Sequence, residues 1–535
     1  MRKLRRFLLL LFIPAAVPAQ VKVDSSRIFC GHEVALDNNN RLLPRKVAAK
    51  NAYDDFLRLR WNFIKTRVPN SPGPAPRSDY PQYYFYCAFI DSAGILLPDH
   101  WMNDVGEKVP MWLESARMFR DYSGDDGPLQ LAKGLVDYSI DHGITPPDYK
   151  WPNFPYTTTN AGDLEFRGFT TRFAPDDLHV DHAGDIGAAY FKAYLVFDDV
   201  KYLDAAVRVA DVLASKVQKG SDTTSPWPYI VNAQTGNIVS EYGTNWFGCI
   251  RLFDMLIDAG HGNTHGYADA LKMVKEWLLA VPFKNGKWVD GHTDTQVKGT
   301  TNLSNLSASN AGLYLSDHVQ FTRDWKTLLP GLIRWTEDNF VFKSAEGEPS
   351  QMWGANIVSE QVAFMPKMDY QTARYAAQSA KWYRLSGDTS FKEKAFRSLN
   401  FVTYCNDQYG KAFESPFSKG VNSWWSDSYG ECPLMFYHAL SAMPELAPQG
   451  EDHILYSSGV LKEVSYESGR VIFNTVDKGT EYLRLSFKPS TITIADKQMY
   501  PAKSKAPVVT IEPLQDGDYY VVINRNENGK VVVSK

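Results

Sequence analysis

The sequence lacks the residues and motifs that mark several large classes of protein. Only five of its 535 residues are cysteines, and they are widely separated, so a secreted disulfide scaffold is excluded. No C-x-x-C pair occurs, which removes a zinc ribbon. The chain also has no G-x-S-x-G elbow, P-loop, G-x-G-x-x-G fingerprint or H-E-x-x-H pair. We therefore expect no nucleotide and no redox cofactor.

The chain also has no large excess of one charge and few long apolar runs. Lysine and arginine number 57 against 61 aspartates and glutamates, and no basic stripe stands out, so we expect no nucleic-acid partner. Beyond the N-terminus no stretch is long and apolar enough to span a membrane, which takes about 20 residues. We expect neither a membrane partner nor a membrane anchor.

The N-terminus has the pattern of a secretory signal peptide. Residues 1–6 are basic, residues 7–13 are apolar, and small residues lie at 17 and 19. This order predicts cleavage after Ala19, and hence a periplasmic or secreted protein. Residues 20–42 form an N-terminal extension to the first domain.

Aromatic residues are plentiful, at 13% of the chain. They serve either a large core or surfaces that stack on rings. The alternation of helical patterns assigns many of them to a core. Segments apolar on nearly all sides, as expected of buried helices, lie near 108–120, 183–197, 245–258, 307–320, 369–385 and 429–442. Amphipathic segments, as expected of covering helices, lie near 45–66, 128–142, 201–217, 266–280, 324–340 and 390–404.

A short motif recurs at the start of the covering helices. Asp199-x-x-Tyr202-x-x-x-Ala206 and Asp388-x-x-Phe391-x-x-x-Ala395 have the same spacing, and looser relatives follow at intervals of about 58–73 residues. Six inner and six outer helices predict an (α/α)6 toroid over residues 43–447, in preference to an open solenoid. Residues 453–535 alternate or are rich in β-branched residues, which predicts a small sandwich-like all-β domain.

Long loops precede the inner helices, whereas the opposite turns are short, so one face of the toroid is elaborated and should carry the site. The densest cluster of polar residues is 172–185, where Asp181 opens an inner helix beside His179 and His182. Asp181 is either an acid or base or merely a helix cap, and a metal set is the weakest interpretation. We expect no metal. The remaining candidates are acids, an amide and aromatics in or next to the loops, and one arginine on an inner helix, namely Asp104, Glu241, Asn245, Trp246, Asp290, Trp353, Tyr370, Trp424, Trp425 and Arg374.

The alternating helices, the Asp-x-x-aromatic-x-x-x-Ala helix starts and the loops rich in acids and tryptophan resemble the six-hairpin glycosidase superfamily. The resemblance covers about residues 43–445, and within the group it points to β-glucuronidases of glycoside hydrolase family 154. It implies an enzyme that removes a terminal uronic acid, with β-glucuronic acid preferred, from an oligo- or polysaccharide.

In that interpretation two carboxylates act, with Asp181 and Glu241 preferred and Asp104 and Asp290 in reserve. The sugar carboxylate would be held by basic residues and the rings by aromatic ones. The basic set is Arg172, His179, His182 and Arg374, and the stacking set is Trp246, Trp353, Trp424 and Trp425. Asn245 and Tyr370 complete the expected substrate contacts.

Two other functions stay open at this stage. A polysaccharide lyase needs a tyrosine or histidine base and a group that neutralises the uronate, and it releases an unsaturated product. A glycan-binding protein without catalysis keeps the tryptophans but does not need the acids. Whether the protein is a monomer or a homo-oligomer is left open as well.

Overall fold

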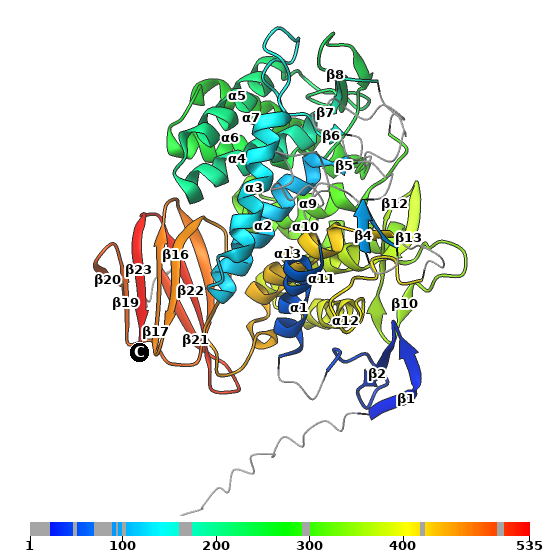
Figure 1. The fold of residues 1–535 in the computed structure, drawn as a ribbon, viewed down its shortest axis with the longest axis vertical. Coiled ribbons are helices and arrows are strands. Elements are labelled where there is room, and N and C mark those ends of the chain that lie inside the picture. The colour runs from blue at the N-terminus through cyan, green and yellow to red at the C-terminus, as the bar shows by residue number, and fades with distance from the viewer. Residues whose placement is uncertain are drawn as a thin grey trace, which may run out of the picture.

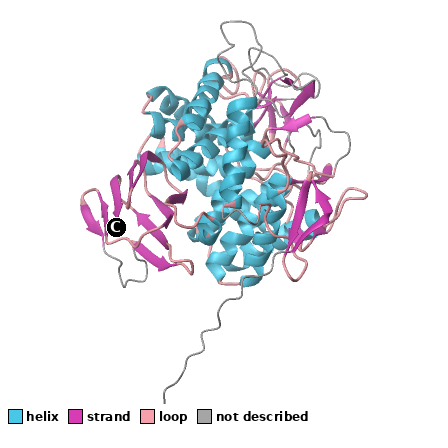
Figure 2. Ribbon diagram, turned by 60° about the horizontal axis from the view of Figure 1, so that its bottom comes forward, coloured by secondary structure: helices cyan, strands magenta, loops and turns pink. Residues whose placement is uncertain are grey.

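The computed structural model describes residues 22–46, 51–68, 88–92, 95–98, 103–159, 174–290, 300–417, 423–499 and 508–535. Helices form the body, and strands lie at two opposite sides of it (Figures 1 and 2). No helix among these residues is both long and apolar enough to cross a membrane. The expected signal peptide, residues 1–19, lies outside the described residues.

Six long helices form the inner layer and six the outer layer. The inner helices are α2 (Val105–Ser123), α4 (Val180–Phe197), α6 (Phe247–Ala259), α9 (Asn305–Asp317), α11 (Asp369–Ser386) and α13 (Asp427–Ala442). The outer helices are α1 (Ala52–Arg67), α3 (Gly127–His142), α5 (Val200–Lys216), α7 (Thr264–Ala280), α10 (Trp325–Thr336) and α12 (Thr389–Thr403). All twelve overlap the predicted segments.

The inner helices close into a ring. Each contacts the next along the chain, and α13 returns to pack against α2. Closure explains why inner helices such as α4 carry so few polar residues, since neighbours cover them on most sides. The prediction of an (α/α)6 toroid is confirmed, and the open solenoid is wrong.

The repeated motif caps and anchors the outer helices. The side chains of Asp199 and Asp388 accept hydrogen bonds from backbone N–H groups two residues on, at 3.0 and 2.9 Å. The buried Tyr202 donates its hydroxyl to Asp137 on the preceding outer helix at 2.5 Å. Tyr267 does the same to Asp211 on the next pair of helices, also at 2.5 Å. The motif thus links successive hairpins of the ring.

The C-terminal strands form a sandwich of two antiparallel sheets, as predicted. The first has the order β15 (His453–Ser457), β18 (Gly479–Leu485), β22 (Tyr519–Arg525), β21 (Val509–Pro513). The second has the order β16 (Leu461–Glu467), β17 (Arg470–Thr475), β23 (Gly529–Ser534), β19 (Thr491–Ile494), β20 (Lys497–Met499). Apolar side chains fill the space between them.

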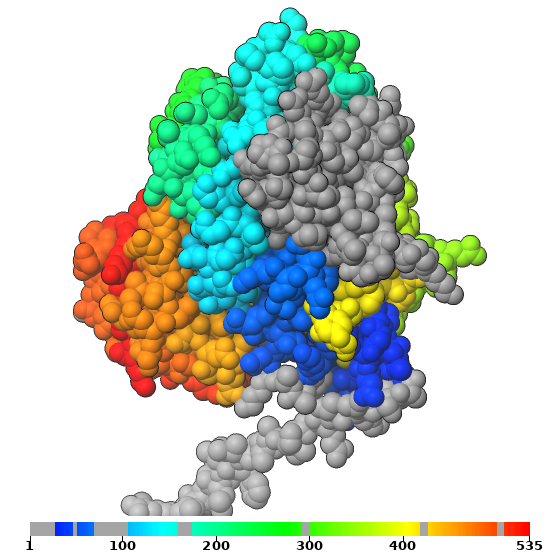
Figure 3. All heavy atoms as spheres, in the orientation of Figure 1, coloured from blue at the N-terminus to red at the C-terminus, as the bar shows by residue number. Residues whose placement is uncertain are grey.

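The sandwich packs against the toroid at the end where the helical turns are short. Arg117 and Arg120 of α2 donate to backbone carbonyls of Gly459 and Leu461 at 2.8 and 2.7 Å. In Figure 3 the orange and red surface of the sandwich adjoins the cyan surface formed by α2 and α3. The opposite end of the toroid, hereafter the mouth, carries the small hairpins.

Strands in the long loops of the mouth lead directly into inner helices. The mouth strands are β3 (Ala88–Ser92), β4 (Ile95–Pro98), β5 (Asn103–Asp104), β6 (Thr158–Thr159), β7 (Asp177–His179), β8 (Ile230–Asn232), β9 (Ile238–Ser240), β10 (Gln351–Met352), β11 (Ala355–Asn356), β12 (Val358–Gln361), β13 (Phe364–Met368) and β14 (Ser423–Trp425). The extension before the toroid forms a hairpin of β1 (Lys22–Phe29) and β2 (His32–Leu36). Each strand that ends at a helix fixes the direction from which the chain enters it.

Close packing of α4 on α6 gives a test of this architecture. A Cβ at Gly184 would lie 2.3 Å from Cys249 Sγ and 2.9 Å from the Cys249 backbone nitrogen. Because the backbone cannot yield easily, we expect Gly184→Ala to lower the free energy of unfolding by about 1–3 kcal/mol in urea titrations. Gly331→Ala on α10 is the control. A Cβ there meets nothing within 4 Å, so that variant should be neutral or slightly more stable. Equal effects from both would contradict the packing.

Candidate active site

A cavity of about 1050 Å³ runs along the axis of the toroid. Its mouth end is lined by His182, Asn245 and Arg374, and its other end by sandwich residues such as Ser458 and Lys478. Every inner helix contributes to its wall. Side chains from all six hairpins therefore converge on one space large enough for a small ligand.

Three carboxyl groups gather where α4 begins at the mouth. Asp181 is fully buried, and neither of its oxygens has a hydrogen-bond partner among the described residues. Burial raises the pKa of Asp181 well above its usual range; the nearby His182 opposes this rise, and the charges of Asp290 and Asp185 add to it. The raised pKa favours the protonated form of the Asp181 carboxyl, which is the form that a general acid needs.

Asp290 has a different environment from Asp181. It is buried, and the hydroxyl of Tyr229 donates a hydrogen bond to its Oδ1 at 2.9 Å. A hydrogen bond to a carboxylate favours the ionised form. The structure thus brings together two of the predicted carboxylates, Asp181 and Asp290, in unlike surroundings.

His179 and His182 lie beside Asp181. Their rings are 5.3 Å apart and nearly parallel, and Tyr229 packs edge-on to His179 at 5.0 Å. One donor atom from each histidine and one from Asp181 all lie within 4.8 Å of one another. Two imidazoles and a carboxylate are a ligand set that suits zinc or a related transition metal.

The structure holds a second candidate set of metal ligands, made of carboxylates alone. The oxygens of Glu107, Asp427 and Glu431 also lie within 4.8 Å of one another. Lys108 contacts both Glu107 and Asp427, and Arg374 contacts Glu431. These carboxylates are already neutralised by side-chain cations, so they are poorly suited to hold a metal ion.

The sequence predicts Arg374 as one of the contacts for a substrate carboxylate. It lies at the cavity wall, but its guanidinium pairs with Glu431 and donates to Ser309 and Asn310 at 3.0 and 2.8 Å. Burial lowers its pKa to about 10. Asn310 in turn donates to Asn245 at 2.9 Å. Arg374 is therefore already paired within the cavity wall, and its contact with a substrate carboxylate stays a prediction.

Four further predictions are corrected by burial or position. Trp246 is fully buried, packs against Trp227 and donates its indole N–H to the carbonyl of Gly243 at 2.8 Å, so it cannot stack on a sugar. The side chain of Glu241 is exposed and does not line the cavity. Both residues lie in the segment between β9 and α6.

The other two corrected residues are aromatic. Tyr370 is buried and donates its hydroxyl to Glu360 at 2.5 Å. Trp353 packs edge-on to Phe29 of the N-terminal hairpin, with ring centroids 6.2 Å apart, and does not line the cavity. These side chains fasten the loop before α11 rather than face a ligand.

Several predicted residues lie outside what the structure describes. Arg172 falls in the undescribed range 160–173. For Asp104, Trp424 and Trp425 only the backbone is described. Asp104 in β5 directly precedes α2, and the two tryptophans in β14 pair with β3.

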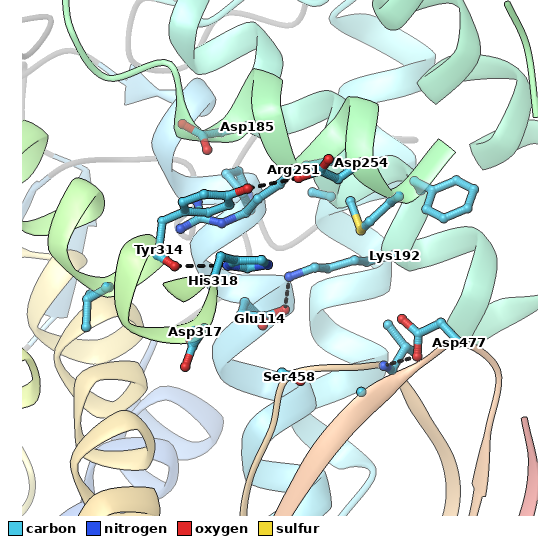
Figure 4. A pocket seen from close by; sticks show the side chains of 18 of the residues that line it. Glu114, Asp185, Lys192, Arg251, Asp254, Tyr314, Asp317, His318, Ser458 and Asp477 are labelled. Carbon is cyan, nitrogen blue, oxygen red and sulfur yellow. Dashed lines mark hydrogen bonds and ion pairs between the residues drawn. The ribbon is translucent and has the colours of Figure 1, made fainter. Parts of the chain in front are cut away.

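Sequence reasoning missed the charged residues deeper in the cavity. Lys192, Arg251 and Asp254 lie on helices whose overall apolar character hid them, and all three line the cavity. The spacing of three residues between Arg251 and Asp254 places both on one helical face, which is the signal that could have found them. Figure 4 shows these side chains pointing into the same space.

The fold matches that of solved structures, although no protein-family model and no curated protein matches the sequence. A D-mannose isomerase superposes with a TM-score of 0.53 at 10% identity, over 76% of this chain and 99% of that one. A cellobiose 2-epimerase from Spirochaeta thermophila gives 0.50 at 10% identity, over 74% and 97%. An unsaturated glucuronyl hydrolase from Streptococcus agalactiae gives 0.45 at 14% identity, over 75% and 95%.

The first two similarities show the fold alone, an (α/α)6 toroid. The fold that the sequence resemblance implied is therefore confirmed. The narrower likeness to β-glucuronidases stays a prediction.

The carboxyl group of Asp185 gives a prediction about pH. Burial raises its pKa to about 6, against the opposing charge of Arg251. An unfolded aspartate titrates near 3.9, so the folded state binds this proton more tightly and loses stability as the pH rises from about 4 to 6. Asp185→Asn should remove that loss. The unfolding free energy of the variant relative to wild type should rise from pH 4 to pH 7, by on the order of 2 kcal/mol.

Urea titrations at four pH values measure this difference. Asp388→Asn is the matched control, because hydrogen bonds from Ser390 lower the pKa of Asp388 and keep its titration below the same window. A pH-independent difference for Asp185→Asn would contradict the raised pKa.

Proposed function

We propose that the protein is a carbohydrate-active enzyme that hydrolyses a glycosidic bond at the mouth of the toroid. The observation that carries the proposal is the buried Asp181, which has no hydrogen-bond partner among the described residues, next to Asp290. A buried carboxyl with a raised pKa, beside a second carboxyl that accepts a hydrogen bond from Tyr229, is the kind of pair that acid-catalysed glycoside cleavage needs. The fold supports this assignment, since the proteins that share it include sugar-converting enzymes.

In the proposed reaction Asp181 gives its proton to the glycosidic oxygen as the bond from that oxygen to the anomeric carbon breaks. Asp290, which Tyr229 holds as an acceptor, takes a proton from the attacking water, whose oxygen bonds to the anomeric carbon. Alternatively Asp290 attacks that carbon itself, and water then releases the sugar. Carboxyl separations of about 5 Å and about 6.5–9.5 Å distinguish retention from inversion.

We propose further that the sugar removed is a terminal uronic acid, with β-glucuronic acid preferred. The support is the likeness seen in the sequence and the basic side chain of His182, which lines the mouth end of the cavity. Export is part of the same proposal, since a leader cleaved after Ala19 would bring the enzyme to extracellular glycans.

The stacked imidazoles favour a second candidate. His179 and His182 lie on either side of the point where β7 becomes α4, and Asp181 lies between them in the sequence. Two bases near one carbon are what an isomerase or epimerase needs to move a proton next to a carbonyl. Two of the solved structures that share the fold are a D-mannose isomerase and a cellobiose 2-epimerase.

Sugar release from a panel of aryl glycosides, glucuronide included, tests the hydrolase. We expect Asp181→Asn and Asp290→Asn each to lower kcat by about 10²–10⁴-fold, since each removes a proton-transfer group. Glu241→Gln is the matched control, because its exposed side chain lies away from the cavity, and it should keep wild-type activity. Full activity of Asp181→Asn would overturn the assignment.

Incubation of reducing sugars in heavy water tests the second candidate. An isomerase or epimerase should incorporate deuterium next to the carbonyl, visible by NMR, and His182→Gln should abolish the incorporation. A hydrolase gives no such exchange. Incorporation without any glycoside hydrolysis would replace the first proposal by the second.

A further inference from the structure

The half of the cavity away from the mouth forms a chamber of its own character. We name it the lower chamber, and it is lined by Glu114, Lys192, Arg251, Asp254 and Tyr314 from the inner helices. Figure 4 shows these side chains between Asp185 above and Ser458 and Asp477 of the sandwich below. The proposed reaction at Asp181 and Asp290 uses none of them.

The lower chamber reaches solvent beside the sandwich. At its rim Asp258 and Lys478 form an ion pair of 2.8 Å between the toroid and the sandwich, with side chains 47% and 57% exposed. By contrast, the cavity residues His182 and Asn245 at the mouth end are 2% and 1% exposed. Within the part of the chain that the structure describes, the sandwich end is thus the more open one.

Charges on the inner helices are almost all compensated. With one exception, each lysine and arginine of these six helices has a carboxylate within 4 Å. The paired residues are Lys108, Lys192, Arg117, Arg120, Arg374, Lys381 and Arg384. Arg251 is the exception among the described residues. Its guanidinium lies over the ring of Tyr314, 5.8 Å from the centroid, and lines the cavity.

No ion pair joins Arg251 to an acid among the described residues. Burial raises the pKa of Asp185 to about 6, and the charge of Arg251 opposes that rise. Asp254 accepts the hydroxyl of Tyr314 at 2.9 Å, and burial raises its pKa as well. Glu114 is already paired with Arg117 and Lys192.

The positive potential of Arg251 is felt by its neighbours. The charge of Arg251 helps to lower the pKa of Lys192 and of His438, although burial and other charged groups have larger effects. Burial is the main cause of the lowered pKa of His438, about 3, which leaves that imidazole neutral. An anion placed at Arg251 would relieve an uncompensated charge in a space of low dielectric.

The walls around Arg251 suit a sugar better than a bare anion. Tyr314 stacks on His318, with centroids 4.1 Å apart and planes 11° apart, and gives an aromatic wall. Glu114, Asp254 and Asp317 offer carboxylate oxygens as acceptors for hydroxyl groups. A small inorganic anion would use the cation but neither the aromatic wall nor these acceptors.

We propose that the lower chamber is a binding site for a sugar that carries one carboxylate, that Arg251 contacts this carboxylate, and that the ligand enters beside the sandwich. The class of sugar rests on the proposed function, whereas the site rests on the cavity and on Arg251. It is separate from the reacting pair, so that the sandwich takes part in ligand binding as well as in packing.

Calorimetric titration of the full chain with free glucuronate, with glucose and inorganic phosphate for comparison, tests the site. We expect glucuronate alone to bind, and Arg251→Met to weaken it by about 10–100-fold, the value of a charge-assisted hydrogen bond. Arg251→Lys should keep part of the affinity, which shows that a loss in Arg251→Met comes from the lost charge and not from misfolding. Arg384→Met, which removes an inner-helix arginine paired at the surface with Glu512, should bind as wild type.

Two further variants separate this site from the reacting centre. Asp181→Asn should lose glycoside hydrolysis yet bind glucuronate normally. Ser458→Trp, at the exposed rim, should slow association without changing hydrolysis. Loss of binding in Asp181→Asn but not in Arg251→Met would overturn the proposal, as would equal binding of phosphate or no binding of glucuronate by wild type. Normal binding in Arg251 variants with hydrolysis intact would overturn the site and leave the proposed function standing.

Discussion

The closed contact between α13 and α2 is the constraint on which the rest of the structure depends. Once the ring is closed, each inner helix has one side toward its outer partner, two sides toward its neighbours and one toward the axis. The first three can be largely apolar, and apolar side chains form most of their packing. The axial side has no protein layer behind it, so whatever polar residues it carries must find partners across the lumen or meet a ligand there.

Most of the buried charged side chains are paired with a side chain of opposite charge. Arg60 of α1 and Asp369 of α11 are both fully buried and pair at 3.1 Å, and Ser428 adds a hydrogen bond to the same carboxylate at 2.7 Å. Such pairs hold neighbouring hairpins in register, because removal of either partner would leave an uncompensated charge in the core. Asp181 departs from this pattern, as the buried Glu414 does, since neither oxygen of either carboxyl has a hydrogen-bond partner among the described residues. A buried group of this kind calls for an explanation, and catalysis is the one proposed for Asp181.

The sequence predicted the architecture well and the site only in part, for one physical reason. Helical periodicity reports on each helix by itself, and the Asp-x-x-aromatic motif reports on its start, so the twelve helices and the sandwich could be recognised. Burial of a loop residue depends instead on elements distant in the chain. Trp246 looked like a ligand surface because it lies in a polar loop, yet Trp227 from another loop covers it. Arg251 looked like an incidental charge on an apolar helix, because the axis it faces exists only after the ring closes.

The two ends of the axial cavity differ in the way their charges are arranged. At the mouth, acids outnumber the described cations, which favours proton transfer, since adjacent carboxyls drive one another's pKa values apart. Toward the sandwich, a cation is left without a partner, and this favours binding rather than proton transfer. An (α/α)6 ring needs only its own loops to build the first kind of site. The second kind needs a wall across the far end of the ring, and here that wall is the β-sandwich, whose residues Ser458 and Asp477 line the same cavity as Arg251. The C-terminal domain thereby covers part of the far end of the axial cavity, which would otherwise be fully open to solvent.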